Sequence, residues 1–144
     1  MKHDPFTLRV ALSKKGGARG ELYLDDGESY SYRAGQLVWR DLVAELVDRK
    51  VLRISSRDAA TGAAALNAAR NEFAESIERV RVEKITVLGL VRPKSVRVEN
   101  GKELEWEFVP GLSAGQKKEG ASSVLTVKDP GVRINRDWDI IIQL

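Results

Sequence analysis

The sequence predicts an all-β protein, built as an antiparallel β-sandwich. Apolar residues alternate with polar ones in several short runs, and turn-forming residues separate these runs. Alternation with a period of two is typical of a strand that buries one face, and many short strands between turns are typical of a sandwich. The chain has 144 residues, of which 42% are hydrophobic, and this is enough apolar material for the core of one such domain.

The alternation is clearest in four runs of the chain, at residues 6–12, 21–24, 103–108 and 138–144. Further strands are expected at 80–88 and 95–99. In the first of these two, the apolar face switches near Lys84, which predicts a β-bulge or a sharp twist. Turn residues separate the runs at 15–17 (KGG), 100–101 (NG), 110–111 (PG) and 129–131 (DPG).

Two segments do not follow this pattern. The apolar residues of 38–47 lie on one helical stripe, so the pattern alone favours a helix there. Residues 59–78 contain eight alanines, and Leu66, Ala69, Phe73 and Ile77 stand at helical spacing. This second segment is expected to be either a short helix or a variable insertion between two strands.

Composition excludes several kinds of site and partner. The chain has no cysteine, and His3 is its only histidine, so a thiolate or multi-histidine metal site is excluded. The net charge of +3 comes from 24 basic and 21 acidic residues that are interspersed, without the basic block that nucleic acid requires. No apolar run approaches the roughly 20 residues of a membrane-spanning helix. We therefore expect no cofactor, no nucleic-acid partner and no membrane insertion.

An acidic cluster is the most specific local feature, in residues 20–30 (GELYLDDGESY). Asp26-Gly27 suits a two-residue type I′ hairpin turn, which would place Asp25 opposite Glu28. The carboxylates of Asp25, Asp26 and Glu28 could then bind Ca²⁺ or serve as an acid/base pair. The alternative is a tight exposed turn that needs no ligand, and we prefer it because Asp-Gly turns are common.

Three tryptophans are candidates for stacking on sugar rings. Trp106 and Trp138 are in phase with the aliphatic residues of their strands, which indicates that they belong to the core. Trp39 stays open, because the structure of its segment is ambiguous.

Four segments of the chain carry a family resemblance. Residues 4–12 (DPFTLRVAL), followed by 20–28 (GELYLDDGE), resemble the C-terminal region of glycoside hydrolase family 31. Residues 77–80 with 85–89, and 129–134 with Asp137-Trp138, are similar to the segments that follow in the glucosidase II branch of that family. The resemblance covers most of the chain apart from 59–76 and 110–121.

The resemblance implies a domain organisation. In this family a (β/α)₈ barrel is followed by a proximal and then a distal β-sandwich. Residues 1–36 would be the last strands of the proximal sandwich and would pair with strands outside this chain. Residues 37–144 would be the distal sandwich, with a variable Ala-rich insertion at about 59–76. The family also makes 38–47 a strand, against the helical pattern, and we adopt the strand. Met1 would then be an internal residue of a longer polypeptide.

The resemblance also implies a function. A retaining glycosidase uses two carboxyl groups about 5–5.5 Å apart, and in this family both belong to the barrel, which needs roughly 250 residues. We therefore expect no catalytic residue in this chain, which would support the barrel as part of a nicked but associated enzyme. The whole enzyme would trim α-1,3-linked glucose from N-glycans in the endoplasmic reticulum, with a non-catalytic β subunit as partner. Two alternatives stay open, a carbohydrate- or protein-binding module and the same region of a maltase-type α-glucosidase.

Overall fold

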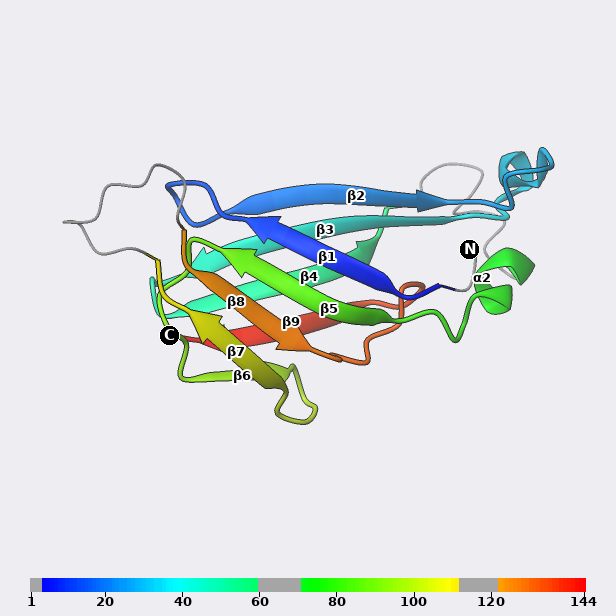
Figure 1. Ribbon diagram of the computed structural model, residues 1–144. Helices are drawn as coiled ribbons and strands as arrows, with labels where there is room; N and C mark the ends of the chain where they lie inside the picture. Colours follow the sequence, from blue (N-terminus) through cyan, green and yellow to red (C-terminus); the bar gives the residue numbers. More distant parts are fainter. Residues whose placement is uncertain (1–3, 60–70, 112–121) are drawn as a thin grey trace.

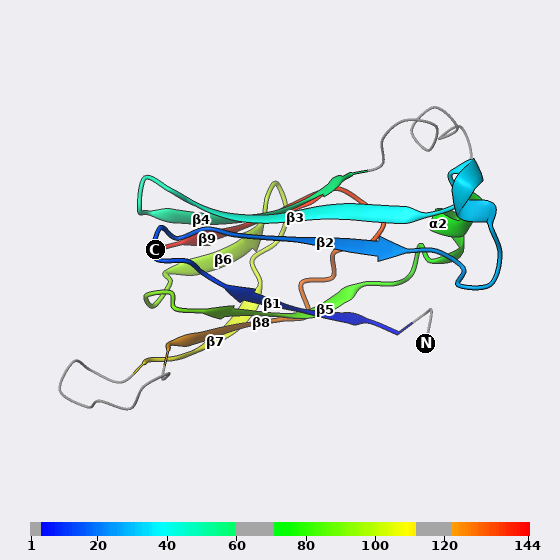
Figure 2. The same cartoon turned by 90° about the horizontal axis from the view of Figure 1, so that it is seen from above.

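The computed structural model describes residues 4–59, 71–111 and 122–144, and these form two β-sheets packed face to face (Figures 1 and 2). The four-stranded sheet has the order β1 (Phe6–Ala11), β5 (Val82–Leu88), β8 (Val124–Lys128), β7 (Glu105–Val109). The five-stranded sheet has the order β2 (Ala18–Leu24), β3 (Val38–Val47), β4 (Val51–Asp58), β9 (Trp138–Gln143), β6 (Ser95–Val98). The predicted all-β sandwich is confirmed. Its strand pairs are antiparallel except β1 and β5, which are parallel.

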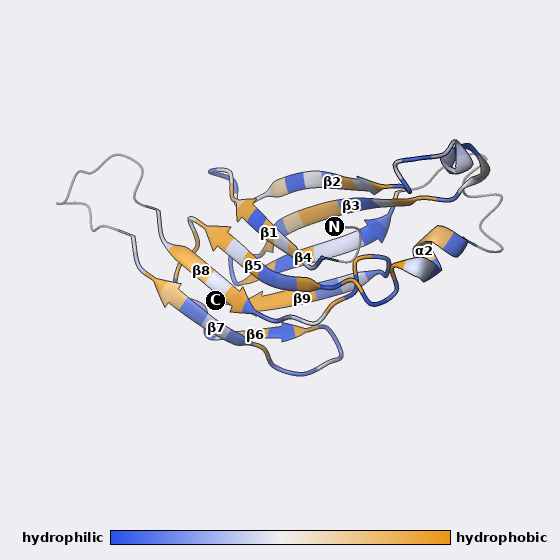
Figure 3. Cartoon of the chain, turned by 45° about the vertical axis from the view of Figure 1, so that its right-hand side comes forward, coloured by the Kyte–Doolittle hydropathy of each residue, from blue (hydrophilic) through white to orange (hydrophobic). Residues whose placement is uncertain are grey.

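The predicted alternation is visible along the strands. In β1 the burial alternates residue by residue, with Phe6, Leu8 and Val10 turned inward. Figure 3 shows apolar and polar residues alternating along several strands of both sheets. The inward side chains of the two sheets form one core, and Leu52, Ile85, Leu125, Ile140 and Ile142 are completely buried in it. Each such side chain contributes about 1.5–3 kcal/mol on leaving water.

The irregularity predicted near Lys84 is a β-bulge. Phe6 pairs with Val82, but the next residue of β1, Thr7, pairs with Lys84. Glu83 is the extra residue, and it changes which positions of β5 face the core. As a result Val82 lies inward before the bulge, and Ile85 and Val87 lie inward after it.

Residues 38–47 form a strand along their whole length. β3 pairs with β2 on one side and with β4 on the other. The strand expected from the family resemblance is therefore confirmed, and the helical pattern is misleading here. The reason is that hydrogen bonding on both sides, together with burial of Val38 and Ala44 in the core, outweighs a local preference.

The Ala-rich segment is described only in part. Residues 60–70 lie outside the described residues, and so do Leu66 and Ala69. A short helix, α2 (Glu72–Ser76), follows, and its first turn is capped by the Asn71 side chain, which accepts a hydrogen bond from the Ala74 N–H at 3.0 Å. Phe73 and Ile77, four residues apart, both reach the core. The short helix is thus confirmed for the end of the segment.

Both strands of residues 1–36 belong to the two sheets of this chain. β1 pairs with β5, and β2 pairs with β3. Each strand therefore has a partner in 37–144, and each is also the edge strand of its sheet, so pairing of 1–36 with strands outside the chain stays a prediction. A boundary at residues 36 and 37 would run through one common core. The assignment of 1–36 to a preceding domain of a longer enzyme stays a prediction.

Candidate functional site

The acidic cluster lies in the connection between β2 and β3, not in a two-residue turn. The chain after Leu24 continues through residues 25–30 into a 3₁₀ helix at Ser31–Ala34 before β3 begins. A type I′ turn requires positive φ at both central residues. Gly27 has a φ of 69°, but Asp26 is not among the described residues with positive φ, so the predicted turn geometry is wrong.

The carboxylate of Asp26 explains the different path. It accepts hydrogen bonds from the backbone N–H groups of Glu28 and Ser29 at 3.1 and 3.0 Å, and from the hydroxyls of Ser29 and Ser31. Asp25 accepts one from the Gly27 N–H at 2.8 Å. Short polar side chains that bind the backbone two or three residues ahead stabilise such a turn. The sequence carried a signal for this in the serines that follow the two aspartates.

These hydrogen bonds also determine the charge of Asp26. The Ser29 hydroxyl, followed by the backbone N–H groups of Ser29 and Glu28, lowers the pKa of Asp26 to about 2. A general acid needs a raised pKa, so Asp26 is unsuited to that role at neutral pH. Within the described ranges, no group of three or more His, Cys, Asp and Glu side chains could hold a metal ion. The geometry supports a structural role for the cluster.

The tryptophans separate into core and surface residues. Trp138 lies in the core with 7% of its surface exposed. Trp106 packs against the core, and the guanidinium of Arg92 lies 5.4 Å from its ring centroid. The predicted packing role of both is therefore confirmed.

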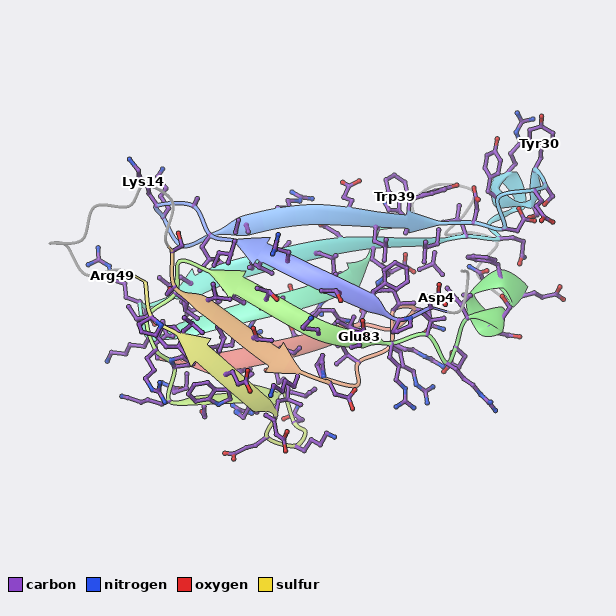
Figure 4. The ribbon with its side chains drawn as sticks, in the orientation of Figure 1. Asp4, Lys14, Tyr30, Trp39, Arg49 and Glu83 are labelled. Carbon is purple, nitrogen blue, oxygen red and sulfur yellow. The ribbon has the colours of Figure 1, made fainter. Side chains whose placement is uncertain are left out.

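Trp39 lies on the outer face of the five-stranded sheet, at the position paired with Tyr23 (Figure 4). The two rings meet edge to face, with centroids 6.2 Å apart. The indole N–H of Trp39 donates to Glu21 Oε2 at 3.2 Å, and Tyr23 is 47% exposed. This aromatic pair is the feature of the described chain that most resembles a sugar-stacking surface.

A buried arginine lies at an inward position of β3, and sequence reasoning missed it. Arg40 is only 3% exposed. Its guanidinium donates to Ser56 Oγ at 2.9 Å, to the Arg136 carbonyl at 2.8 Å and to Asp137 Oδ1 at 2.6 Å. Once 38–47 is assigned as a strand, its alternation places residue 40 on the core side. That alternation could have predicted the burial of Arg40 from the sequence. Arg40 and these three partners form a charged cluster that joins residues 136–137, just before β9, to the five-stranded sheet.

A second charged cluster joins residues 133–136 to Glu78, which lies just after α2. Glu78 accepts hydrogen bonds from Arg136 at 2.8 Å, from Asn135 at 2.7 Å and from Arg133. These bonds, with that from Arg136 the strongest, lower the pKa of Glu78 to about 2. Both charged clusters are structural contacts.

His3, the single histidine of the sequence, lies outside the described residues.

Curated proteins similar to this chain match it along its whole length. Two are named probable glucan 1,3-alpha-glucosidase, one from Arabidopsis thaliana with 34% identity over 144 residues and one from Oryza sativa subsp. japonica with 37% over 145 residues. Each match covers 99% of this chain and 14% of the relative. Neutral alpha-glucosidase AB of Dictyostelium discoideum is 31% identical over 147 residues, with 100% of this chain and 13% of the relative covered. No family model matches the chain.

Solved structures agree with these relatives. A crystal structure of a glucosidase II alpha subunit in its Glc1Man2-bound form superposes with a TM-score of 0.71 and 30% identity, covering 100% of this chain and 15% of the other. A heterodimeric ER glucosidase II complex of a catalytic subunit and the binding domain of a regulatory subunit gives a TM-score of 0.68 with the same identity and coverage.

The β-sandwich is therefore of a kind found in glycoside hydrolases, within enzymes that cleave α-glucosides. More narrowly, the chain is a homologue of one region of the glucosidase II α subunits and the glucan 1,3-α-glucosidases. It spans only about 14% of the length of the curated relatives that it matches. No helix of the described residues is long and apolar enough to cross a membrane.

Proposed function

We propose that this chain is a non-catalytic, C-terminal β-sandwich region of a larger α-glucosidase of the glucosidase II type, and that it supports the catalytic barrel. The observation that carries this proposal is the coverage, because relatives match nearly all of this chain with only about a seventh of their own length. A region of that size supplies one domain of a large enzyme.

The chemistry of the enzyme would belong to the part of the polypeptide outside this chain. A (β/α)₈ barrel needs roughly 250 residues of alternating strands and helices, whereas the described elements are almost all strands. The acidic cluster of Asp25, Asp26 and Glu28 lies in a turn. The carboxylate of Asp26 already accepts four hydrogen bonds there. The chain alone is therefore expected to be inactive, with the catalytic aspartates on the barrel.

The whole enzyme would remove α-1,3-linked glucose from N-glycans in the lumen of the endoplasmic reticulum. The names of the two plant relatives, glucan 1,3-alpha-glucosidases, support the α-1,3 linkage. The similarity to glucosidase II alpha subunits supports the removal of glucose from N-glycans. A regulatory β subunit is the expected partner, because one of the neighbouring structures is a complex of that kind. The chain would stay associated with the remainder of the enzyme even when the connecting peptide is nicked.

Two-part reconstitution tests the proposal. The chain and the separately produced remainder of the polypeptide are assayed with a chromogenic α-glucoside, alone and mixed, and association is followed by gel filtration. We expect no turnover by the chain alone and co-elution of the two parts. Hydrolysis by the purified chain would contradict the non-catalytic assignment. Failure of the two parts to associate would contradict the supporting role.

A binding module is the second candidate, and the surface pair of exposed Tyr23 and half-buried Trp39 is the observation that favours it. Titration calorimetry of the chain with glucosylated oligosaccharides separates the two functions, since a supporting domain predicts no heat. The third candidate is the same region of a maltase-type α-glucosidase. The substrate-contacting residues of the barrel would decide between that enzyme and the glucosidase II type.

A further inference from the structure

An open groove lies at one end of the sandwich, opposite the β2–β3 connection that carries the acidic cluster. Three turns and one strand end form it, namely the β1–β2 turn, the β3–β4 turn, the segment after β5 and the end of β9. It encloses about 700 Å³. We call it the basic groove, lined by Leu12, Ser13, Lys14, Lys15, Gly16, Leu46, Asp48, Arg49, Gly89, Leu90, Val91 and Leu144.

The floor of the basic groove is apolar. Leu12, Leu46 and Leu144 are half-buried and pack against the core, and Leu90 is 5% exposed. At the lip, Val91 is 64% exposed, one of the largest exposures of any apolar side chain among the described residues. A hollow with leucines below and an exposed valine at its edge offers places for apolar side chains of about leucine size.

The rim of the groove is cationic. Lys14, Lys15 and Arg49 line it, and the carboxylates in the lining are those of Asp48 and of the C-terminal Leu144. Within the described parts of the chain, no hydrogen bond or ion pair holds the side chains of these three cations. Figure 4 shows Lys14 and Arg49 projecting at the same end of the molecule, far from Tyr30. The groove therefore combines an apolar floor with positive charge that has no hydrogen-bond or ion-pair partner among the described residues.

The walls of the groove are held in place by backbone contacts. The Gly16 N–H donates to the Ser13 carbonyl at 2.8 Å, and the Ser13 N–H donates to the Gly17 carbonyl at 2.9 Å. The Leu144 N–H donates to the Lys50 carbonyl at 2.8 Å, which ties the end of β9 to the β3–β4 turn. A preformed surface loses little conformational entropy on binding.

We propose that the basic groove docks an acidic segment of the remaining α-glucosidase polypeptide, one that carries carboxylates beside leucine-like side chains. The carboxylates would pair with Lys14, Lys15 and Arg49, and the apolar side chains would cover the leucine floor. This inference rests on the proposed function, because the remainder of a polypeptide about seven times longer is the nearest source of such a segment. Charge complementarity selects an acidic occupant over a basic one.

Charge reversal on the rim tests the inference. The labelled chain is titrated with the separately produced remainder of the polypeptide, followed by fluorescence anisotropy. Lys14→Glu and Arg49→Glu are each expected to weaken binding about fivefold or more, with a larger loss at low salt than at high salt. Lys102→Glu, an exposed substitution with the same change in charge on the β6–β7 turn, is the matched control and should bind like the unaltered chain.

The outcomes separate this inference from the function on which it rests. If the unaltered chain binds the remainder and all three variants bind equally well, the docking site lies elsewhere and the supporting role survives. If the unaltered chain does not bind, both proposals fall. If the chain instead forms a dimer that Lys14→Glu disrupts, the occupant is a second copy and the proposed one is wrong. A short synthetic peptide of alternating Leu and Glu should bind the chain, and its Leu and Lys counterpart should not; equal binding of both would overturn the charge argument.

Discussion

Arg40 and Asp137 form an ion pair in which one partner is buried and the other is exposed. The distance from Arg40 Nη2 to Asp137 Oδ1 is 2.6 Å, and the side chains are 4% and 58% exposed. Asp137 also accepts a hydrogen bond from the Asp58 N–H at 3.2 Å. The exposed carboxylate is thus the main compensation for a charge that lies at the edge of the core.

Removing Asp137 should therefore cost more than its exposure indicates. Asp137→Ala removes the carboxylate that pairs with the buried Arg40 charge, which should destabilise the protein by about 1–3 kcal/mol. Arg40→Met combined with Asp137→Ala should be more stable than Asp137→Ala alone, because the buried charge is then absent as well. Chemical denaturation of the unaltered chain, Asp137→Ala, Arg40→Met and the double variant measures the coupling between the two residues. Equal stability of Asp137→Ala and the double variant would show that the unpaired Arg40 charge carries no cost.

The depressed pKa of Glu78 predicts a dependence of stability on pH. The folded-state pKa is about 2, against an ordinary value of 4.5. The stabilising effect of the Arg136, Asn135 and Arg133 contacts is present above pH 4.5 and is lost as the pH falls towards 2. Glu78→Gln should weaken the dependence of the denaturation midpoint on pH over this range. NMR titration of the Glu78 carboxyl in the unaltered chain measures its pKa directly. Glu75→Gln, at an exposed position nearby, is the control.

Gly16 and Gly20 should respond in opposite ways to an added methyl group. Gly16 has a φ of 81°, and a Cβ there would lie 2.8 Å from the Leu46 Cβ, so Gly16→Ala should destabilise the protein by about 1–3 kcal/mol. Gly20 in β2 has open space around it, and Gly20→Ala should be neutral or stabilising by up to about 1 kcal/mol. Thermal unfolding of the two variants provides the comparison. A similar loss in both would argue against the close contact with Leu46.

Trp138 and Trp39 should differ in their contributions to stability. Trp138→Ala removes a large side chain from the core, which costs about 3–5 kcal/mol. Trp39→Ala removes a ring from the outer face, where the loss should be about 1 kcal/mol. Denaturant titrations measure both values. A loss at Trp39 as large as that at Trp138 would make the surface pair a structural element, and the argument for a sugar-stacking surface would be lost.

Local pattern was sufficient for most of the strands. In 6–12 and 138–144 the side chains on one face are apolar at every second position, and a strand that packs on a core places those side chains inward whatever its neighbours are. The phase change near Lys84 was readable for the same reason, because a bulge shifts the period of two by one residue. The contacts of Phe73 and Ile77 with the core followed from helical spacing.

The tertiary structure decided the features that depend on residues far apart in the chain. Residues 38–47 have a helical stripe, yet strands on both sides hold them extended. The connection at 25–37 could not be read from Asp26-Gly27, because the Asp26 carboxylate binds groups further along the loop. The position of Arg40 against Asp137, and the meeting of three turns at the basic groove, exist only when the sheets have assembled. Periodicity reports which face of an element is apolar, whereas the partner that covers this face is set by long-range packing.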